Sequence, residues 1–225
     1  MVSVMRLILV GCEYSGTTTL ANAISVCAEK SMGANLTIHD HFKYPYLLHE
    51  EMTDAEAEQM LALPSHIKAP MQFHMMSYHT MPAVLEKQDY ILVGLHIDDA
   101  VYAPLYKGYG MSWRVPDAGA IARYTDTHIM TSVPDILMVL VKASPEVIAQ
   151  RMKENPRKYS PLLVKDIDFV LKRFREEFEK SLLPNKFVLE TSSSTVRETL
   201  ADFVRLVEPF LEETDRLRMQ LHKIK

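Results

Sequence analysis

The residues best suited to chemistry stand near the start of the chain, in the stretch "GCEYSGTTT" over 11–19. Two glycines, Gly11 and Gly16, are separated by four residues, and three threonines follow the second glycine. This spacing is that of a phosphate-binding loop, G-x-x-x-x-G-K-[ST], whose backbone N–H groups surround an anion at the start of a helix. The position of the motif lysine holds Thr17, so the loop has a neutral hydroxyl where a cation is expected.

The other positions of this stretch have expected roles in holding a phosphate. The glycines allow a tight turn and a close approach of the backbone to a ligand. We expect the N–H groups from Ser15 to Thr19 to point at the anion, aided by the positive end of the helix. Thr18 stands where the motif keeps a hydroxyl for Mg²⁺. A tight strand-to-helix turn with a hydroxyl-rich cap is the alternative interpretation.

Five short apolar runs must position this loop, at 6–11, 36–40, 90–96, 136–143 and 186–191. Runs that are apolar on both faces are typical of a parallel sheet covered by helices. Helix-start signals lie between them, such as "SPEV" before the fifth run. The sequence therefore predicts a doubly wound α/β fold, with a five-stranded parallel sheet, helices on both faces and the first strand in the centre. Such sheets bind ligands at the carboxyl ends of their strands, where the loop lies.

Length and composition limit the class of function. With 225 residues, of which 48% are hydrophobic and 24% charged, we expect one globular domain over 1–225, ending in a helix at about 209–223. The net charge of −4 argues against binding to nucleic acid or to a membrane surface. There is no apolar run of membrane-spanning length and no secretory signal pattern. Because two cysteines suggest no disulfide framework, we expect a cytoplasmic protein.

The stretch "GCEYSGTTTLA" resembles the phosphate loop of thymidylate kinases and related nucleoside and nucleotide kinases. Gly11, Glu13, Gly16, Thr18 and Thr19 match the family pattern. Further stretches are similar to the substrate helix with the third strand (71–102), to the fourth strand with the lid (133–158), and to the fifth strand with the loop beside the nucleotide base (187–204). The resemblance implies an ATP-dependent phosphotransferase that uses Mg²⁺ and a small-molecule phosphate acceptor, and it allows a homodimer.

The missing lysine is the main departure from this family. Its ammonium neutralises the β- and γ-phosphates, and the loss of such a donor costs about 3 kcal/mol or more. A kinase with a neutral residue there needs a cation from elsewhere. A lid-like segment at about 150–165 offers Arg151 and Arg157, where the family uses arginines to clasp phosphates, and Arg151 is our first candidate. Lys142 and Lys158 are further candidates, and solvated surface charge is the alternative for each.

Acidic residues after the second and third strands are the candidate catalytic and metal-binding groups. Asp40 is expected to accept a proton from the acceptor hydroxyl. The family's Asp-Arg after the third strand is absent, but Asp98, a catalytic candidate, and Asp99, a Mg²⁺ candidate with Thr18, lie just beyond. His96 is expected at the strand end facing the cleft, although helix capping and packing are alternatives here. Residues expected near the acceptor are Gln72, Phe73, His74, Arg114, Asp117, Arg123 and Tyr124, with His39 and His41 beside Asp40.

Two other function classes stay open. The residues "SGTT" at 15–18 match letter for letter the loop with which sulfotransferases bind the 5′-phosphosulfate of their donor. That family has a basic residue where Tyr14 stands, and Lys142 and Ser144 match its 3′-phosphate site imperfectly. A nucleotide-binding protein without turnover is the third class.

Overall fold

The fold is built on a sheet of five parallel strands. The computed structural model describes residues 5–40, 52–86, 89–110 and 117–223. The strands are β1 (Arg6–Val10), β2 (Thr37–His39), β3 (Tyr90–Val93), β4 (Leu137–Lys142) and β5 (Asn185–Glu190). Their order is β2-β3-β1-β4-β5, and every neighbouring pair is parallel. The predicted fold class and the central place of the first strand are confirmed.

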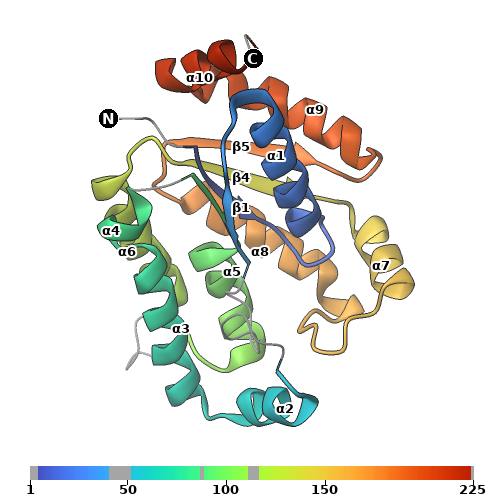
Figure 1. Ribbon diagram of the computed structural model, residues 1–225. Helices are drawn as coiled ribbons and strands as arrows, with labels where there is room; N and C mark the ends of the chain where they lie inside the picture. Colours follow the sequence, from blue (N-terminus) through green and yellow to red (C-terminus); the bar gives the residue numbers. More distant parts are fainter. Residues whose placement is uncertain (1–4, 41–51, 87–88, 111–116, 224–225) are drawn as a thin grey trace.

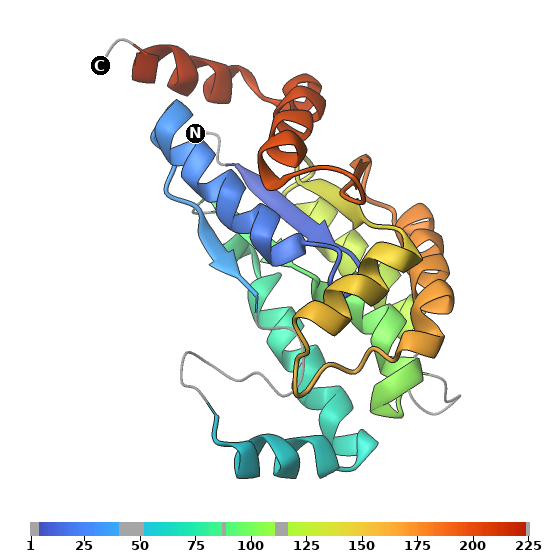
Figure 2. The same cartoon turned by 90° about the vertical axis from the view of Figure 1, so that its right-hand side faces the viewer.

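Helices cover both faces of the sheet (Figure 1). One face carries α1 (Thr17–Met32) and α9 (Val196–Val207), and the other carries α5 (Leu95–Tyr102), α6 (Ala118–Ser132) and α8 (Ile167–Lys180). The remaining helices are α2 (Asp54–Ala62), α3 (Ser65–His79), α4 (Pro82–Leu85), α7 (Pro145–Glu154) and α10 (Glu213–Lys223). Single turns are the π-helical η1 (Ala103–Lys107) and the 3₁₀ turns η2 (Val164–Asp166) and η3 (Glu208–Phe210). Figure 2 shows α10 and α2 at opposite ends of the molecule.

Alternation along the central strand explains why both faces are covered. Leu7 and Leu9 belong to the apolar core beneath α1 and α9, whereas Ile8 and Val10 belong to the core shared with Phe174 of α8. All four strand residues are 0–1% exposed. Burial of such a side chain stabilises the fold by about 1.5–3 kcal/mol. Because both faces are buried, the strand is a continuous apolar run in the sequence.

The third predicted strand and the predicted C-terminal helix differ from expectation. The third strand stops at Val93, because Gly94 takes φ +89 and turns the chain into α5. A side chain at Gly94 would meet a carboxylate oxygen of Asp98 at 2.6 Å. The C-terminal helix expected at about 209–223 is divided into η3 and α10, and α10 is fixed to the sheet by Arg218, whose Nη2 donates to Asp89 at 2.8 Å.

A buried polar network fixes α5 against α6 and the end of α8. Asp126 is fully buried and accepts from His96 Nε2 at 2.7 Å and Arg123 Nε at 3.0 Å. It also accepts from Ser181 Oγ and the N–H of Leu182, both at 3.0 Å. Burial raises the pKa of the Asp126 carboxyl, but these hydrogen bonds and the neighbouring charges lower the pKa overall. His96 is 1% exposed, and its Nε2 is bonded to Asp126. The expectation that it faces the cleft is therefore wrong.

We expect Asp126→Asn to destabilise the protein at pH 7 by about 3–5 kcal/mol, as removal of one partner from a buried ion pair does. The lowered folded-state pKa of Asp126 means that its charge stabilises the fold above the unfolded value of about 3.9. This contribution is lost as the pH falls through the lower, folded-state pKa. Urea unfolding from pH 7 to pH 3 should show the gap between variant and wild type shrinking. Asp202→Asn, at an exposed pair with Arg205, is the matched control and should change little.

Candidate active site around the phosphate-binding loop

The predicted loop lies where the sequence places it, between β1 and α1 at the carboxyl edge of the sheet. The N–H of Ser15 donates to the carbonyl of Cys12 at 3.0 Å and closes the turn. Gly16 then takes φ +100 as the residue before α1 and provides no side-chain cap. Because the first N–H groups of a helix have no partner inside it, the start of α1 is open to an anion.

The two glycines are needed for different reasons. A Cβ at Gly11 would come within 2.4 Å of the Val141 carbonyl and 2.7 Å of Ser15 Oγ, so this position requires close approach. Apart from its chain neighbours, no described residue has an atom within 4 Å of a Cβ placed at Gly16, although the φ of Gly16 disfavours other residues. Ser15 Oγ is buried and has no hydrogen-bond partner among the described residues. Two neighbouring loop residues therefore offer an open space, at Gly16, and a hydroxyl without a partner among the described residues, at Ser15.

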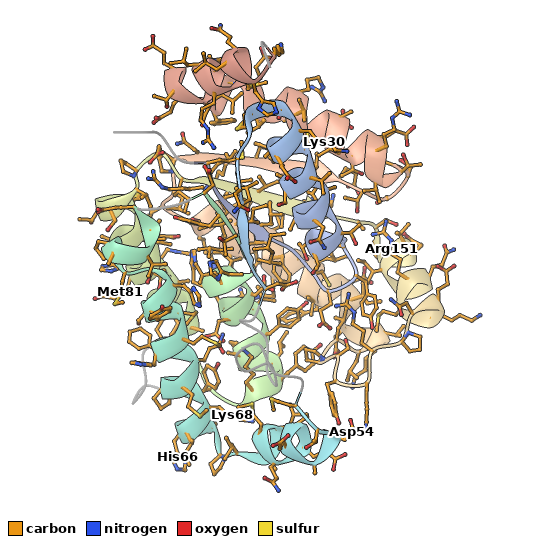
Figure 3. All side chains as sticks on the ribbon, in the orientation of Figure 1. Lys30, Asp54, His66, Lys68, Met81 and Arg151 are labelled. Atoms are coloured by element: carbon orange, nitrogen blue, oxygen red, sulfur yellow. The ribbon has the colours of Figure 1, made fainter. Side chains whose placement is uncertain are left out.

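A cavity of about 300 Å³ adjoins the loop. Its walls come from three parts of the chain, which are the loop with the start of α1, the end of α7 with the lid segment, and the residues after β5. The residues outside the loop that line it are Arg151, Glu154, Asn155, Arg157, Thr191, Ser194, Val196 and Thr199. Figure 3 shows Arg151 on α7 beside the start of α1. The structure thus brings both predicted lid arginines to the loop.

A hydroxyl and a carboxylate meet at the start of α1. Thr18 Oγ1 donates to Asp40 Oδ2 at 2.6 Å, and Asp40 directly follows β2. These are hard oxygen groups of the kind that Mg²⁺ prefers. Thr17 is 6% exposed, and its methyl carbon lies 3.3 Å from the Cβ position of Gly11. Because its side chain is neutral, Thr17 cannot supply the charge of the missing lysine.

The lid segment is attached to two loop residues, Glu13 and Tyr14. Arg151 Nη1 donates to the carbonyl of Tyr14 at 2.9 Å, and its Nη2 donates to the carbonyl of Thr191 at 2.9 Å. The N–H of Arg157 donates to Tyr14 Oη at 3.2 Å, and its guanidinium lies 4.9 Å from the centre of the Tyr14 ring. Ser160 Oγ donates to the Glu13 carboxylate. The lid and the loop are therefore joined to each other where they border the cavity.

Helix α5 also contacts the loop, through Tyr102. The N–H of Glu13 donates to Tyr102 Oη at 2.8 Å. Tyr102 is 2% exposed, and burial raises the pKa of its phenol well above the ordinary value, with the nearby charges of Cys12 and Glu13 adding to the rise. A neutral phenol thus holds the Glu13 side of the loop.

The acidic pair of α5 lies elsewhere. Asp99 is 4% exposed and accepts from Lys107 Nζ at 2.9 Å and Tyr109 Oη at 2.8 Å. Asp98 is 3% exposed and packs against Gly94. Neither residue lines the cavity at the loop. The catalytic role of Asp98 and the metal role of Asp99 stay predictions that this geometry does not favour.

Two of the predicted cations have other partners. Lys142 Nζ lies 3.7 Å from a carboxylate oxygen of Glu190, and Lys158 Nζ lies 2.6 Å from one of Asp54. Neither lysine lines the cavity at the loop. Among the described residues, the cations that line it are Arg151 and Arg157.

Several residues expected near the acceptor have structural roles. Asp117 caps α6 by accepting from the N–H of Gly119 at 2.9 Å, and Arg123 belongs to the Asp126 network. Tyr124 is 65% exposed and Phe73 is 41% exposed, whereas Gln72 is fully buried. His39 Nε2 is buried, and its ring lies 4.7 Å from that of His79. Arg114 and His41 lie outside the described residues. Within the described parts of the chain, no group of three or more His, Cys, Asp and Glu residues could hold a metal.

Sequence reasoning missed four residues that shape the site, namely Tyr14, Tyr102, Ser160 and Thr191. Thr191 had a usable signal, since it directly follows β5 at the ligand-binding edge; its hydroxyl donates to the carbonyl of Ser15 at 2.8 Å. The other three had none, because their partners are distant in sequence. Ser160 and Glu13, for example, are 147 residues apart.

Comparison with known proteins gives matches of structure. No model of a known protein family matches the chain, and no curated protein does. Deoxyadenosine kinase from M. mycoides with bound dCTP aligns over 91% of this chain and 100% of its own, at 15% identity and a TM-score of 0.59. Thymidylate kinase from Candida albicans aligns over 92% of both chains, at 13% identity and a TM-score of 0.57. The chain has the fold of the nucleoside and nucleotide kinases.

A third structure with this kinase fold is the YorR protein from Bacillus subtilis in complex with phosphorylated GDP. It aligns over 90% of this chain and 95% of its own, at 19% identity and a TM-score of 0.56. The three alignments cover 92–100% of these proteins and 90–92% of this chain, so the kinase fold accounts for about nine-tenths of the chain. No helix in the described part of the chain has the length and apolar character needed to cross a bilayer.

Proposed function

We propose that this protein is an ATP-dependent phosphotransferase of the nucleoside or nucleotide kinase type, acting on a small-molecule acceptor. The observation that carries the proposal is the open cradle at the start of α1. There, the space in front of Gly16 and the unpartnered Ser15 hydroxyl adjoin a cavity lined by two arginines. The fold, shared with kinases of nucleosides and nucleotides, supports a nucleoside triphosphate as the donor.

The triphosphate binds along the loop, with its anionic oxygens accepting from the N–H groups of residues 15–19. Glu13 lines the cavity from within the loop, and the outer cavity next to Ser194 and Thr199 receives the rest of the nucleotide. Thr18 is suited to hold Mg²⁺, and Asp40 beside it could contact a water of the ion. When bound, Mg²⁺ neutralises charge on the β- and γ-phosphate oxygens.

Asp40 is the proposed general base. It follows β2 at the same sheet edge as the loop and lies 2.6 Å from the Thr18 hydroxyl, so it is next to the expected γ-phosphate. As the acceptor oxygen forms its bond to phosphorus, its proton passes to the Asp40 carboxylate and the bond to the ADP oxygen breaks. Such a base contributes about 10²–10⁴-fold to the rate.

The positive charge comes from the lid. The charge that a loop lysine would supply is worth about 3 kcal/mol in the transition state. Arg151 and Arg157 both line the cavity, and their guanidinium groups stay charged at any physiological pH. This compensation is what allows a kinase to work with Thr17.

The sulfotransferase alternative receives less support from the geometry. Its 3′-phosphate would require Lys142 and Ser144 beside the loop. Instead, Lys142 pairs with Glu190, and Ser144 caps α7 by accepting from the N–H of Val147 at 3.4 Å. Neither residue lines the cavity at the loop.

A thermal-shift panel with ATP, GTP and 3′-phosphoadenosine 5′-phosphosulfate, each with and without Mg²⁺, tests the proposal. We expect a nucleoside triphosphate with Mg²⁺ to stabilise the protein by about 2.7 kcal/mol at 100 times its Kd. For a chain of this length that is a rise in Tm of about 5–10 °C. A rise with the sulfate donor alone would replace the kinase by a sulfotransferase.

Transfer is then measured with ATP labelled at the γ-phosphate and a panel of nucleosides, nucleotides and other small hydroxyl acceptors. Labelled product from at least one acceptor is the expected result. Binding of ATP without transfer to any of them would identify a nucleotide-binding protein without turnover. The homodimer allowed by the family resemblance is checked on the same preparation by light scattering.

A further inference from the structure

We propose that Tyr14 is a positioning residue that holds the Arg157 guanidinium over the phosphate-binding loop, and that the pair replaces the missing loop lysine. This inference rests on the proposed function. It goes beyond that function because it assigns different tasks to the two lid arginines and gives a role to an aromatic residue inside the loop.

The two arginines differ in how their donors are used. Arg151 donates to the carbonyls of Tyr14 and Thr191, both at 2.9 Å, and to Thr191 Oγ1 at 3.4 Å. Arg151 therefore links the loop to the residues after β5 by hydrogen bonds. The guanidinium of Arg157 makes no hydrogen bond or ion pair with any described residue, and it lines the cavity. Its five N–H donors are available to a ligand.

Tyr14 is held for this task by three contacts. Its carbonyl accepts from Arg151, its hydroxyl accepts from the N–H of Arg157 at 3.2 Å, and its ring lies 4.9 Å from the Arg157 guanidinium carbon. The residue is 8% exposed and takes φ +65, a region that bulky side chains rarely adopt. Strained positions of this kind persist where the surroundings determine them, and they concentrate at ligand sites.

The chemistry of the stack explains why the pair can replace a lysine. A guanidinium on an aromatic face keeps its full charge, and the contact uses the face of the group and leaves its N–H edges for phosphate oxygens. The ring also keeps the cation beside the loop before a ligand arrives, so less rotamer freedom is lost when the ligand binds. A loop lysine is always present at the phosphates, whereas Arg157 belongs to the lid. Binding of the triphosphate is thereby coupled to the contact between the lid and the loop.

The test is a double-mutant cycle on Tyr14 and Arg157. Tyr14→Leu and Tyr14→Asn remove the ring, and asparagine tolerates a positive φ, so it keeps the test valid if the leucine variant does not fold. Tyr14→Phe keeps the ring and the backbone strain and removes only the hydroxyl. Each is combined with Arg157→Ala. The readouts are the Kd for ATP, ADP and AMP with Mg²⁺ by calorimetry, and kcat and KM with the acceptor found by the transfer assay.

We expect Arg157→Ala and Tyr14→Asn each to lower kcat about a hundred-fold, as loss of an electrostatic donor does. Affinity for ATP should fall about ten-fold, with little change for AMP. Because both changes remove the same cation from the phosphates, the double variant should be no worse than either single one. Tyr14→Phe should stay within about three-fold of wild type, since the stack remains.

Additive effects in the double variant would overturn the inference, as would a Tyr14→Phe variant as impaired as Tyr14→Asn. In those cases ATP binding and transfer by the wild-type protein leave the proposed kinase function standing. A wild-type protein that binds no nucleotide would overturn the proposed function and this inference together.

Discussion

Nucleotide binding should be lost in Gly16→Val, with the Kd for ATP raised more than a hundred-fold. A Cβ at Gly16 meets no atom within 4 Å from the described part of the chain beyond its two neighbours, so a side chain there projects into the space where the phosphate is expected. Valine at φ +100 also strains the turn by about 1–3 kcal/mol, which would shift the N–H groups of the loop. Calorimetry with ATP and Mg²⁺ measures the loss.

A matched pair of alanine variants, Gly16→Ala and Gly108→Ala, distinguishes backbone strain from blocking of the phosphate site. Gly108 has φ +73, and a Cβ there would lie 3.5 Å from Ser65 Cβ, an ordinary contact. Both variants place alanine at a positive φ, at a cost of about 1–2 kcal/mol, so their Tm values should fall alike. Only Gly16→Ala should weaken ATP binding. Wild-type affinity in Gly16→Val would show that the anion does not bind in this loop.

Much of the frame could be predicted because its causes are local. β1 and β4 are buried on both faces, which makes each a continuous apolar run. The loop at 11–19 follows from glycine spacing, and the starts of α2 and α9 follow from the capping boxes at Thr53 and Thr195. In each case the signal lies within a few residues of the element that it positions.

The expectation for His96 was wrong because its deciding partner is distant in sequence. His96 follows the third strand closely, but its partner Asp126 lies thirty residues further on, and the pairing is visible only once α5 and α6 are packed. The place of Arg151 over the phosphates stays a prediction, and the residue lines the cavity. Its contact with the Tyr14 carbonyl, across 137 residues, gives it a supporting part that no spacing rule contains.

The proposed replacement of the lysine rests on a distinction between a motif and its physical task. An invariant motif describes one way to place a cation at a phosphate, whereas the physical requirement is only a charge at the right position. In this chain the lid lies on Glu13 and Tyr14, so a charge carried by the lid reaches the loop without a side chain from α1. The lid contacts to the loop are therefore more informative than the motif about whether transfer occurs.

Asp40→Asn should lower kcat by about 10²–10⁴-fold at saturating Mg²⁺ and ATP, if Asp40 is the general base. Asparagine keeps an oxygen that can accept from the Thr18 hydroxyl, now at 2.6 Å from Asp40, so the local geometry and the Kd for ATP should change little. What is lost is the group that takes the proton from the acceptor oxygen. Initial rates over a range of Mg²⁺ concentrations measure the effect.

The same titration separates a base from a metal ligand. If Asp40 acts mainly by holding Mg²⁺, Asp40→Asn will shift the Mg²⁺ dependence to higher concentration, and excess metal will restore kcat. If Asp40 is the base, no Mg²⁺ concentration restores kcat. Thr18→Ser is the matched control, because it keeps the hydroxyl beside Asp40 and should retain turnover within a few-fold. Asp40→Asn with a wild-type kcat would contradict both roles and move the search for the base to the acceptor side.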